Sequence, residues 1–84
     1  MSPTKQGWIS ELLVAVDLTK QGYDVYLGYS GQYDMIAIRS SHTYRVEVKT
    51  SRTMKMDWHR VKHEVDILAL VSGEGKIEYR KFRP

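Results

Sequence analysis

The sequence predicts an α/β domain: a mixed β-sheet of about five strands flanked by helices, in the order α-β-β-β-(α)-β-β. Two observations lead to this class. Apolar residues recur at helical spacing over residues 1–22, and from residue 23 the pattern changes to short alternating segments rich in β-branched and aromatic residues. Near the C-terminal end, residues 65–71 form an almost continuous apolar run, which is typical of a strand covered on both faces.

Length and composition set further limits. The chain has 84 residues, which predicts a single domain over 1–84 with a small core that self-association would help to stabilise. A net charge of +3 is compatible with a polyanionic partner. The absence of cysteine excludes disulfides and cysteine-based zinc sites. Without a spanning-length apolar run or a signal-peptide pattern, we expect a soluble, cytoplasmic protein with no membrane partner.

The N-terminal helix is expected to begin at Ser2–Pro3 and to end near Gly22. Its polar side chains do not all lie on one face. On a helical projection Asp17 falls on a narrow polar face with Ser10 and Gln21, whereas Glu11 falls inside the apolar arc and should turn toward the buried side. That arc is formed by Trp8, Ile9, Leu12, Leu13, Ala15 and Val16.

The strands are expected between turn-forming segments. The last strand should lie at an edge of the sheet because its alternation leaves one face polar, and residues 51–64 are expected to form a loop and a short helix. The expected strands are 23–29, 33–39, 44–50, 65–71 and 76–82, with turns at 30–32, 40–43 and 72–75.

Charged residues interrupt two of these strands. If residues 40–43 form a four-residue loop, or a two-residue loop at its centre, Asp34 faces Lys49 and Ile36 faces Glu47. The three charged side chains then project from one face of one hairpin, whereas a three-residue loop would reverse this.

This set of groups suits phosphodiester chemistry. Carboxylate oxygens from Asp34 and Glu47 are suitable ligands for Mg²⁺ or Mn²⁺. Lys49 could orient or activate an attacking water, or stabilise the charged phosphorus centre. The alternative is a structural one, in which Asp34 and Lys49 form only a cross-strand salt bridge.

Three segments together resemble a known family. Residues 11–26 (ELLVAVDLTKQGYDVY), 31–38 (GQYDMIAI) and 44–51 (YRVEVKTS) resemble the motifs of the PD-(D/E)xK phosphodiesterases, and 65–71 resembles their sheet-closing segment. The similarity is greatest to small Holliday-junction resolvases and intron homing endonucleases. It implies a restriction-endonuclease-like fold, with Tyr33 in place of the proline that often precedes the first acid.

The resemblance also implies roles for individual residues. Asp34 and Glu47 match the two metal-binding acids, and Lys49 matches the catalytic lysine. Glu11 matches the helix acid that many members add to the metal site, and Val48 would supply a backbone carbonyl ligand.

Residues around these positions are candidates for contacts to nucleic acid. A run of basic residues follows the motif strand and could contact phosphates, although such runs are often solvated surface. Gln32 precedes Asp34 and could hydrogen-bond a phosphate, but turn formation explains its position equally well. His59 and His63 have the spacing of a helical metal site, and solvated surface histidines are the alternative. The candidate nucleic-acid-binding residues are Gln32, Thr50, Ser51, Arg52, Lys55, Arg60 and Lys62.

The sequence therefore predicts a Mg²⁺- or Mn²⁺-dependent endodeoxyribonuclease that acts on branched or duplex DNA as a homodimer or higher homo-oligomer. The alternative is a non-catalytic nucleic-acid-binding module or an inactive protein of the nuclease fold. An RNA-cleaving relative is not distinguished by the sequence.

Overall fold

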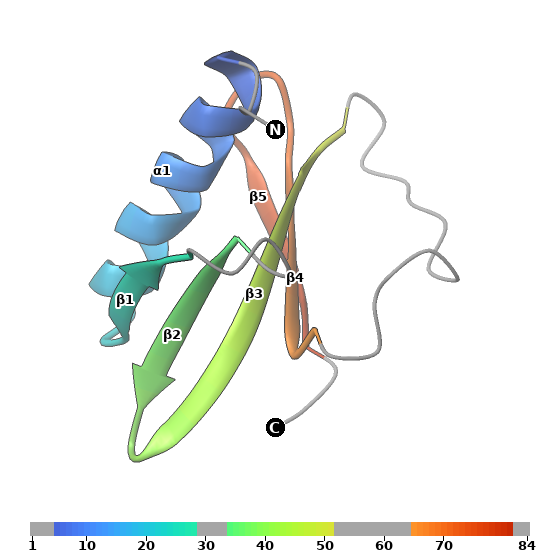
Figure 1. Cartoon of the computed structure of the whole chain (residues 1–84). Helices are drawn as coiled ribbons and strands as arrows, with labels where there is room; N and C mark the ends of the chain where they lie inside the picture. Colours follow the sequence, from blue (N-terminus) through green and yellow to red (C-terminus); the bar gives the residue numbers. More distant parts are fainter. Residues whose placement is uncertain (1–4, 29–33, 52–64, 82–84) are drawn as a thin grey trace.

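The computed structural model describes residues 5–28, 34–51 and 65–81, and it shows an α/β fold with one helix and a five-stranded mixed sheet (Figure 1). The predicted fold class is confirmed. The expected short helix in 51–64 lies outside the described residues. The elements are α1 (Lys5–Lys20), β1 (Asp24–Leu27), β2 (Met35–Arg39), β3 (His42–Thr50), β4 (Ile67–Val71) and β5 (Ile77–Lys81).

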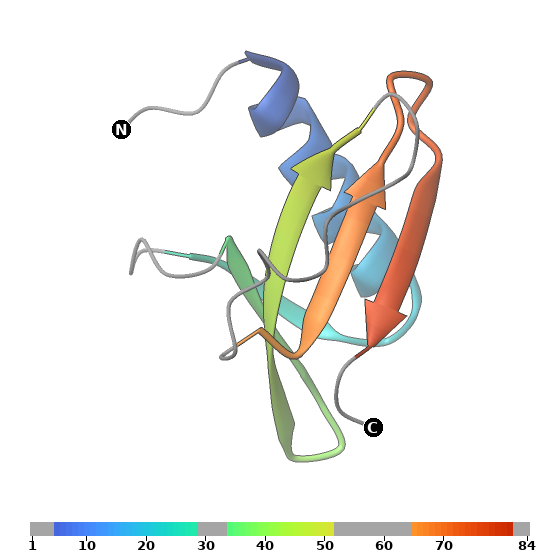
Figure 2. The same cartoon turned by 90° about the vertical axis from the view of Figure 1, so that its right-hand side faces the viewer.

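The strands lie in the sheet in the order in which they occur in the chain, β1-β2-β3-β4-β5. The β3–β4 pair is parallel and the other three pairs are antiparallel. Figure 2 shows β3 and β4 running in the same direction and β5 in the opposite one. All five residues of β4 are buried, as its apolar run predicts, and β5 lies at an edge, as expected.

The core lies between α1 and one face of the sheet. Val14 and Leu18 of the helix pack in one cluster with Met35, Ala37 and Val46. Since side chains alternate along a strand, the α1 side of β3 carries Val46 and Val48, and its other side carries Glu47 and Lys49.

The helix presents a different face to the sheet from the one that its apolar pattern predicts. The side chains buried against the sheet are Ser10, Val14 and Leu18, at i, i+4 and i+8. The predicted apolar arc points outward instead. Trp8, Ile9, Leu12, Leu13 and Val16 are all exposed, and only Ala15 of that set packs against the core.

Asp17 was expected on the outer polar face, but it lies against the sheet. The Tyr79 hydroxyl of β5 donates a 2.5 Å hydrogen bond to its carboxylate, and the Gln21 amide donates another at 2.8 Å. Burial, and then the bond to Asp17, raise the pKa of Tyr79. The interaction fixes the C-terminal half of α1 to the edge strand.

The helix ends as its sequence predicts, since α1 stops at Lys20 and Gly22 follows with a φ of 96°, a conformation that glycine adopts without strain. Ser2 and Pro3 lie outside the described residues. No helix in the described part of the chain is long and apolar enough to cross a bilayer.

The β2–β3 hairpin is tighter than the sequence suggested. Arg39 pairs with His42, so the loop consists of Ser40 and Ser41 alone. Their φ angles of 53° and 67° are those of a type I′ turn, the two-residue turn whose twist matches the flanking strands. The predicted loops, 40–43 or its central pair, are therefore wrong, and the register differs from the expected one by two residues.

This turn leads to a prediction about stability. Serine is unfavourable at positive φ, whereas Asn-Gly is the preferred type I′ pair, so Ser40→Asn with Ser41→Gly is expected to stabilise the protein by about 1 kcal/mol. This corresponds to a Tm increase of roughly 4–8 °C, measurable by calorimetry. An unchanged or lower Tm would contradict the turn assignment.

Candidate functional site

The candidate site is at the point where β3 extends past β2. The β2–β3 ladder ends at Met35 and Val46, while β3 continues to Thr50 (Figure 1). The Asp34 amide also donates to the Val46 carbonyl, at 2.9 Å. Two consecutive residues, Asp34 and Met35, therefore lie opposite the single residue Val46. This is the arrangement of a β-bulge, which redirects a side chain out of strict alternation.

The redirected Asp34 carboxylate takes the place of the missing strand partner. Its Oδ2 accepts a 2.7 Å hydrogen bond from the Val48 amide. Because the N–H and C=O of a strand residue point to the same edge, the Val48 carbonyl is directed to this side of β3 as well. We call this place, formed by Asp34 and the main chain of Val48, the notch.

Glu11 reaches the notch from the helix. Its carboxyl shares a hydrogen bond with Asp34, and it is only partly exposed. Burial, followed by the hydrogen bond to Asp34 and the repulsion of its charge, raises the pKa of Glu11 to about 7. Two carboxyl groups held together in this way retain a proton near neutral pH, and a cation between them would replace it.

Glu47 and Lys49 approach from the other face of β3. Glu47 is 8% exposed, and its Oε1 lies 3.8 Å from the Lys49 ammonium, which is half-exposed. A buried carboxylate beside a solvent-reaching ammonium is an arrangement in which the acid can bind a cation while the lysine contacts an anion.

The predicted site residues thus fall into two pairs around the notch. Glu11 contacts Asp34, and Glu47 contacts Lys49. The expected pairing of Asp34 with Lys49 is wrong, because the two-residue turn moves the register: the Val48 amide, not Lys49, is the partner of Asp34.

The adjoining polar residues also have structural roles. The Thr50 and Ser10 hydroxyls are hydrogen-bonded at 2.7 Å, which links β3 to α1. The Ser51 amide donates to the Val71 carbonyl at 2.9 Å. Sequence reasoning missed Ser10, although the i, i+4 spacing of Ser10, Val14 and Leu18 could have revealed a buried helix face. Gln32, Arg52, Lys55, His59, Arg60, Lys62 and His63 lie outside the described residues.

The oxygen ligands at the notch can be compared with the coordination that a metal ion requires. Within the ranges that the structure describes, no three His, Cys, Asp or Glu side chains gather as a group that could hold a metal. The Glu11–Asp34 pair does match the way Mg²⁺ is commonly bound, by one or two carboxylates with water and substrate oxygens completing the shell. The donor set fits a hard cation whose remaining ligands come from outside this pair.

The fold is similar to that of a known endonuclease. No protein-family model and no curated protein matches the chain. Among solved structures, the chain is similar to the bacterial homing endonuclease I-Ssp6803I, with a TM-score of 0.71 and 20% sequence identity over 96% of this chain and 67% of that one. This likeness establishes a shared fold.

The raised pKa of Glu11 predicts a pH dependence of stability. A carboxyl whose pKa is higher in the folded than in the unfolded protein stabilises the fold below about 4.5, and this contribution is lost as the pH rises through about 7. Glu11→Gln keeps a hydrogen-bond donor for Asp34 but cannot ionise. Between pH 5 and 8 in EDTA, the free energy of unfolding of the wild type should fall by on the order of 1 kcal/mol more than that of the variant, allowing for solvent screening.

Urea unfolding at a series of pH values measures this difference. Glu74→Gln, in the exposed β4–β5 turn, is the matched control and should retain the wild-type slope. Parallel curves for the wild type and Glu11→Gln would show that Glu11 does not share a proton with Asp34.

Proposed function

We propose that this protein is a metal-dependent endonuclease that hydrolyses DNA phosphodiester bonds at the notch. The observation that carries the proposal is the Glu11–Asp34 carboxyl pair, hydrogen-bonded at the end of β2 with Glu47 and Lys49 on the adjoining strand. Its occurrence on a fold shared with a homing endonuclease supports the same activity.

Each residue has a specific part in this proposal. Asp34 and Glu11 would hold Mg²⁺ or Mn²⁺, together with the Val48 carbonyl and Glu47. When bound, the cation supplies positive charge beside the scissile phosphate and lowers the pKa of a coordinated water. Lys49 would orient the attacking water or donate to the phosphate oxygens as negative charge develops. The Asp34–Val48 hydrogen bond keeps the first acid at a fixed position relative to β3.

The preferred DNA is proposed on more general grounds. The homing endonuclease with this fold supports DNA as the polyanion, and the net charge of +3 is compatible with it. Cutting both strands of a duplex or a branched junction requires two sites, so a homodimer is the simplest active form.

A second candidate is a non-catalytic nucleic-acid-binding module of the same fold. One observation favours it: among the described residues the acids do not form a three-carboxylate group, and Lys49 is already engaged with Glu47. In that case the two pairs around the notch would be structural.

A cleavage assay separates the two candidates. The protein is incubated with labelled four-way junction, duplex, flap and single-stranded DNA, in Mg²⁺, Mn²⁺ or EDTA. Metal-dependent cutting is expected, with a loss of about 10²–10⁴-fold in Lys49→Ala. Lys76→Ala, which removes an exposed lysine from the β4–β5 turn, should cut normally. Binding without cutting in either metal, unchanged in Lys49→Ala, would establish the binding module instead.

A further inference from the structure

The outer face of α1 is an apolar surface that the sheet does not cover. Of the six large apolar side chains that the described residues leave exposed, five lie on this helix. We call them the outer stripe: Trp8, Ile9, Leu12, Leu13 and Val16. Tyr26, the sixth, alternates with Val25 and Leu27, which face the helix, and so lies on the other face of β1.

The outer stripe is large enough to be a functional surface. Its side chains are between 38% (Leu13) and 55% (Val16) exposed. Together they leave on the order of 400 Å² of apolar area uncovered, within the range of the largest patch on a typical monomer, which is often functional.

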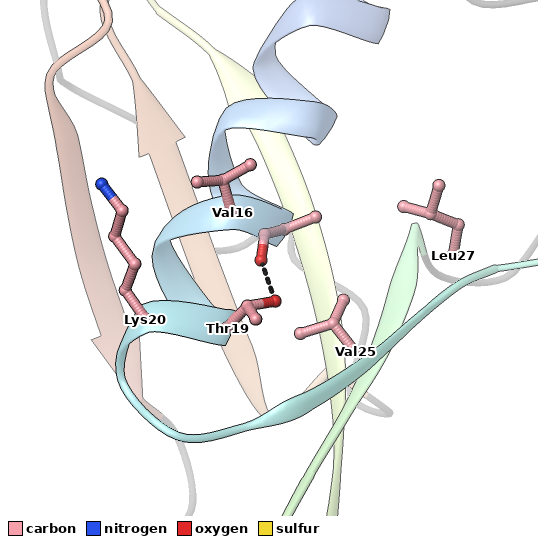
Figure 3. Close-up of a pocket in the computed structure, with 6 residues that line it drawn as sticks. Val16, Thr19, Lys20, Val25 and Leu27 are labelled. Carbon is pink, nitrogen blue, oxygen red and sulfur yellow. Dashed lines mark hydrogen bonds between the residues drawn. The ribbon is translucent and has the colours of Figure 1, made fainter.

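An open groove of about 370 Å³ continues the outer stripe toward β1. Ala15 and Val16 of the helix and Val25 and Leu27 of the strand form its apolar wall, with Thr19 and Lys20 at its rim (Figure 3). A standard interface buries about 800 Å² on each partner. The outer stripe supplies about half of this area, which corresponds to a weak interface that dissociates on dilution.

The charges around the outer stripe restrict the kind of partner. Within α1, Glu11 and Asp17 both lie on the side facing the sheet, where Asp34 and Tyr79 engage them. The charged residues on the outward side of α1 are Lys5 and Lys20, which lie at the two ends of the helix. The centre of the stripe is uncharged, so it selects a partner by apolar shape. A second copy of this chain offers the same apolar surface.

We propose that two copies of this chain associate through the outer stripe, with the twofold axis near Leu12. The side chains lie in i, i+4 rows, Trp8-Leu12-Val16 and Ile9-Leu13, which interlock between two helices crossing at about −50°. At this angle the helix ends diverge, and Lys5 and Lys20 of one copy stay apart from those of the other. The notch remains open because Glu11 points away from the stripe.

This inference does not depend on the nuclease proposal, because the test reads oligomeric state and not cleavage. In sedimentation velocity the wild type should show a dimer that dissociates on dilution. Leu12→Glu should be monomeric over the same concentration series with an unchanged circular dichroism spectrum. Tyr26→Glu, which adds the same charge at an exposed position off the stripe, should dimerise like the wild type.

A second experiment does not rely on a charged substitution that could unfold the helix. The chain has no cysteine, so Leu12→Cys introduces a single thiol beside the proposed axis. A short thiol–thiol crosslinker should convert this variant to a covalent dimer, and Tyr26→Cys should remain monomeric. A wild type that is monomeric throughout, or equal crosslinking of both variants, would overturn the proposal.

Discussion

Asp34→Ala should lower the rate of metal-dependent DNA cleavage by about 10³-fold or more, since it removes the acid at the centre of the proposed site. The same substitution should abolish the rise in Tm that millimolar Mg²⁺ or Mn²⁺ gives the wild type by binding only the folded state. It also removes the acceptor of the Val48 amide, so some loss of stability in EDTA is expected.

The matched variant Asp34→Asn separates the two roles of this side chain. The asparagine carbonyl can still accept the Val48 hydrogen bond, but it carries no charge. It should therefore be almost as stable as the wild type in EDTA and still lack both cleavage and the metal-induced rise in Tm. If Asp34→Asn cleaves DNA at the wild-type rate, Asp34 is not a metal ligand and the notch is not the active site.

Asp66→Ala is expected to produce the largest loss of stability, about 3–5 kcal/mol. Asp66 is 1% exposed and precedes β4, and both its carboxylate and its amide are bonded to one residue of β3. The carboxylate accepts from the Arg45 amide at 2.8 Å and from its guanidinium at 3.1 Å, and the Asp66 amide donates to the Arg45 carbonyl at 2.9 Å. Removing the carboxylate takes this acceptor away from the partly buried amide and guanidinium of Arg45.

Urea unfolding tests the size of this effect. Asp66→Asn keeps an acceptor for the Arg45 amide, so its free energy of unfolding should fall less than that of Asp66→Ala. Glu78→Ala is the control, because Glu78 pairs with Arg80 on the exposed edge strand, where such a pair contributes at most about 1 kcal/mol. Equal losses for Asp66→Ala and Glu78→Ala would mean that the Asp66 carboxylate does not hold β3 and β4 together.

The strands were predictable because their signals are local. Alternation and flanking turn residues are enough to locate all five strands to within about two residues, and the apolar run at 65–71 correctly indicates a buried strand. The face relation of Glu47 and Lys49 also follows from the two-residue period of a strand. It does not depend on the register, so the error at Ser40–Ser41 left it intact.

Other features depend on tertiary contacts that the sequence does not display. Serine gives no signal for a type I′ turn, so the predicted turn and the predicted partner of Asp34 were both wrong. Nothing in the sequence indicates the bulge that turns Asp34 toward Val48. The orientation of α1 was wrong because the usual rule places the most apolar helix face inside. Here that face points outward, and the sheet is covered by Ser10, Val14 and Leu18.

The strand order has a consequence for how the chain folds. Among the described strands, β1, β2 and β3 form consecutive antiparallel pairs, and so do β4 and β5. In the parallel β3–β4 pair the two strands are separated by residues 51–66 of the chain, so its closure costs more loop entropy than any of the three antiparallel connections. We therefore expect two early antiparallel units, β1–β3 and β4–β5, that join at the parallel pair in the rate-limiting step, with Asp66 and Arg45 meeting next to its first rung, Val46–Ile67.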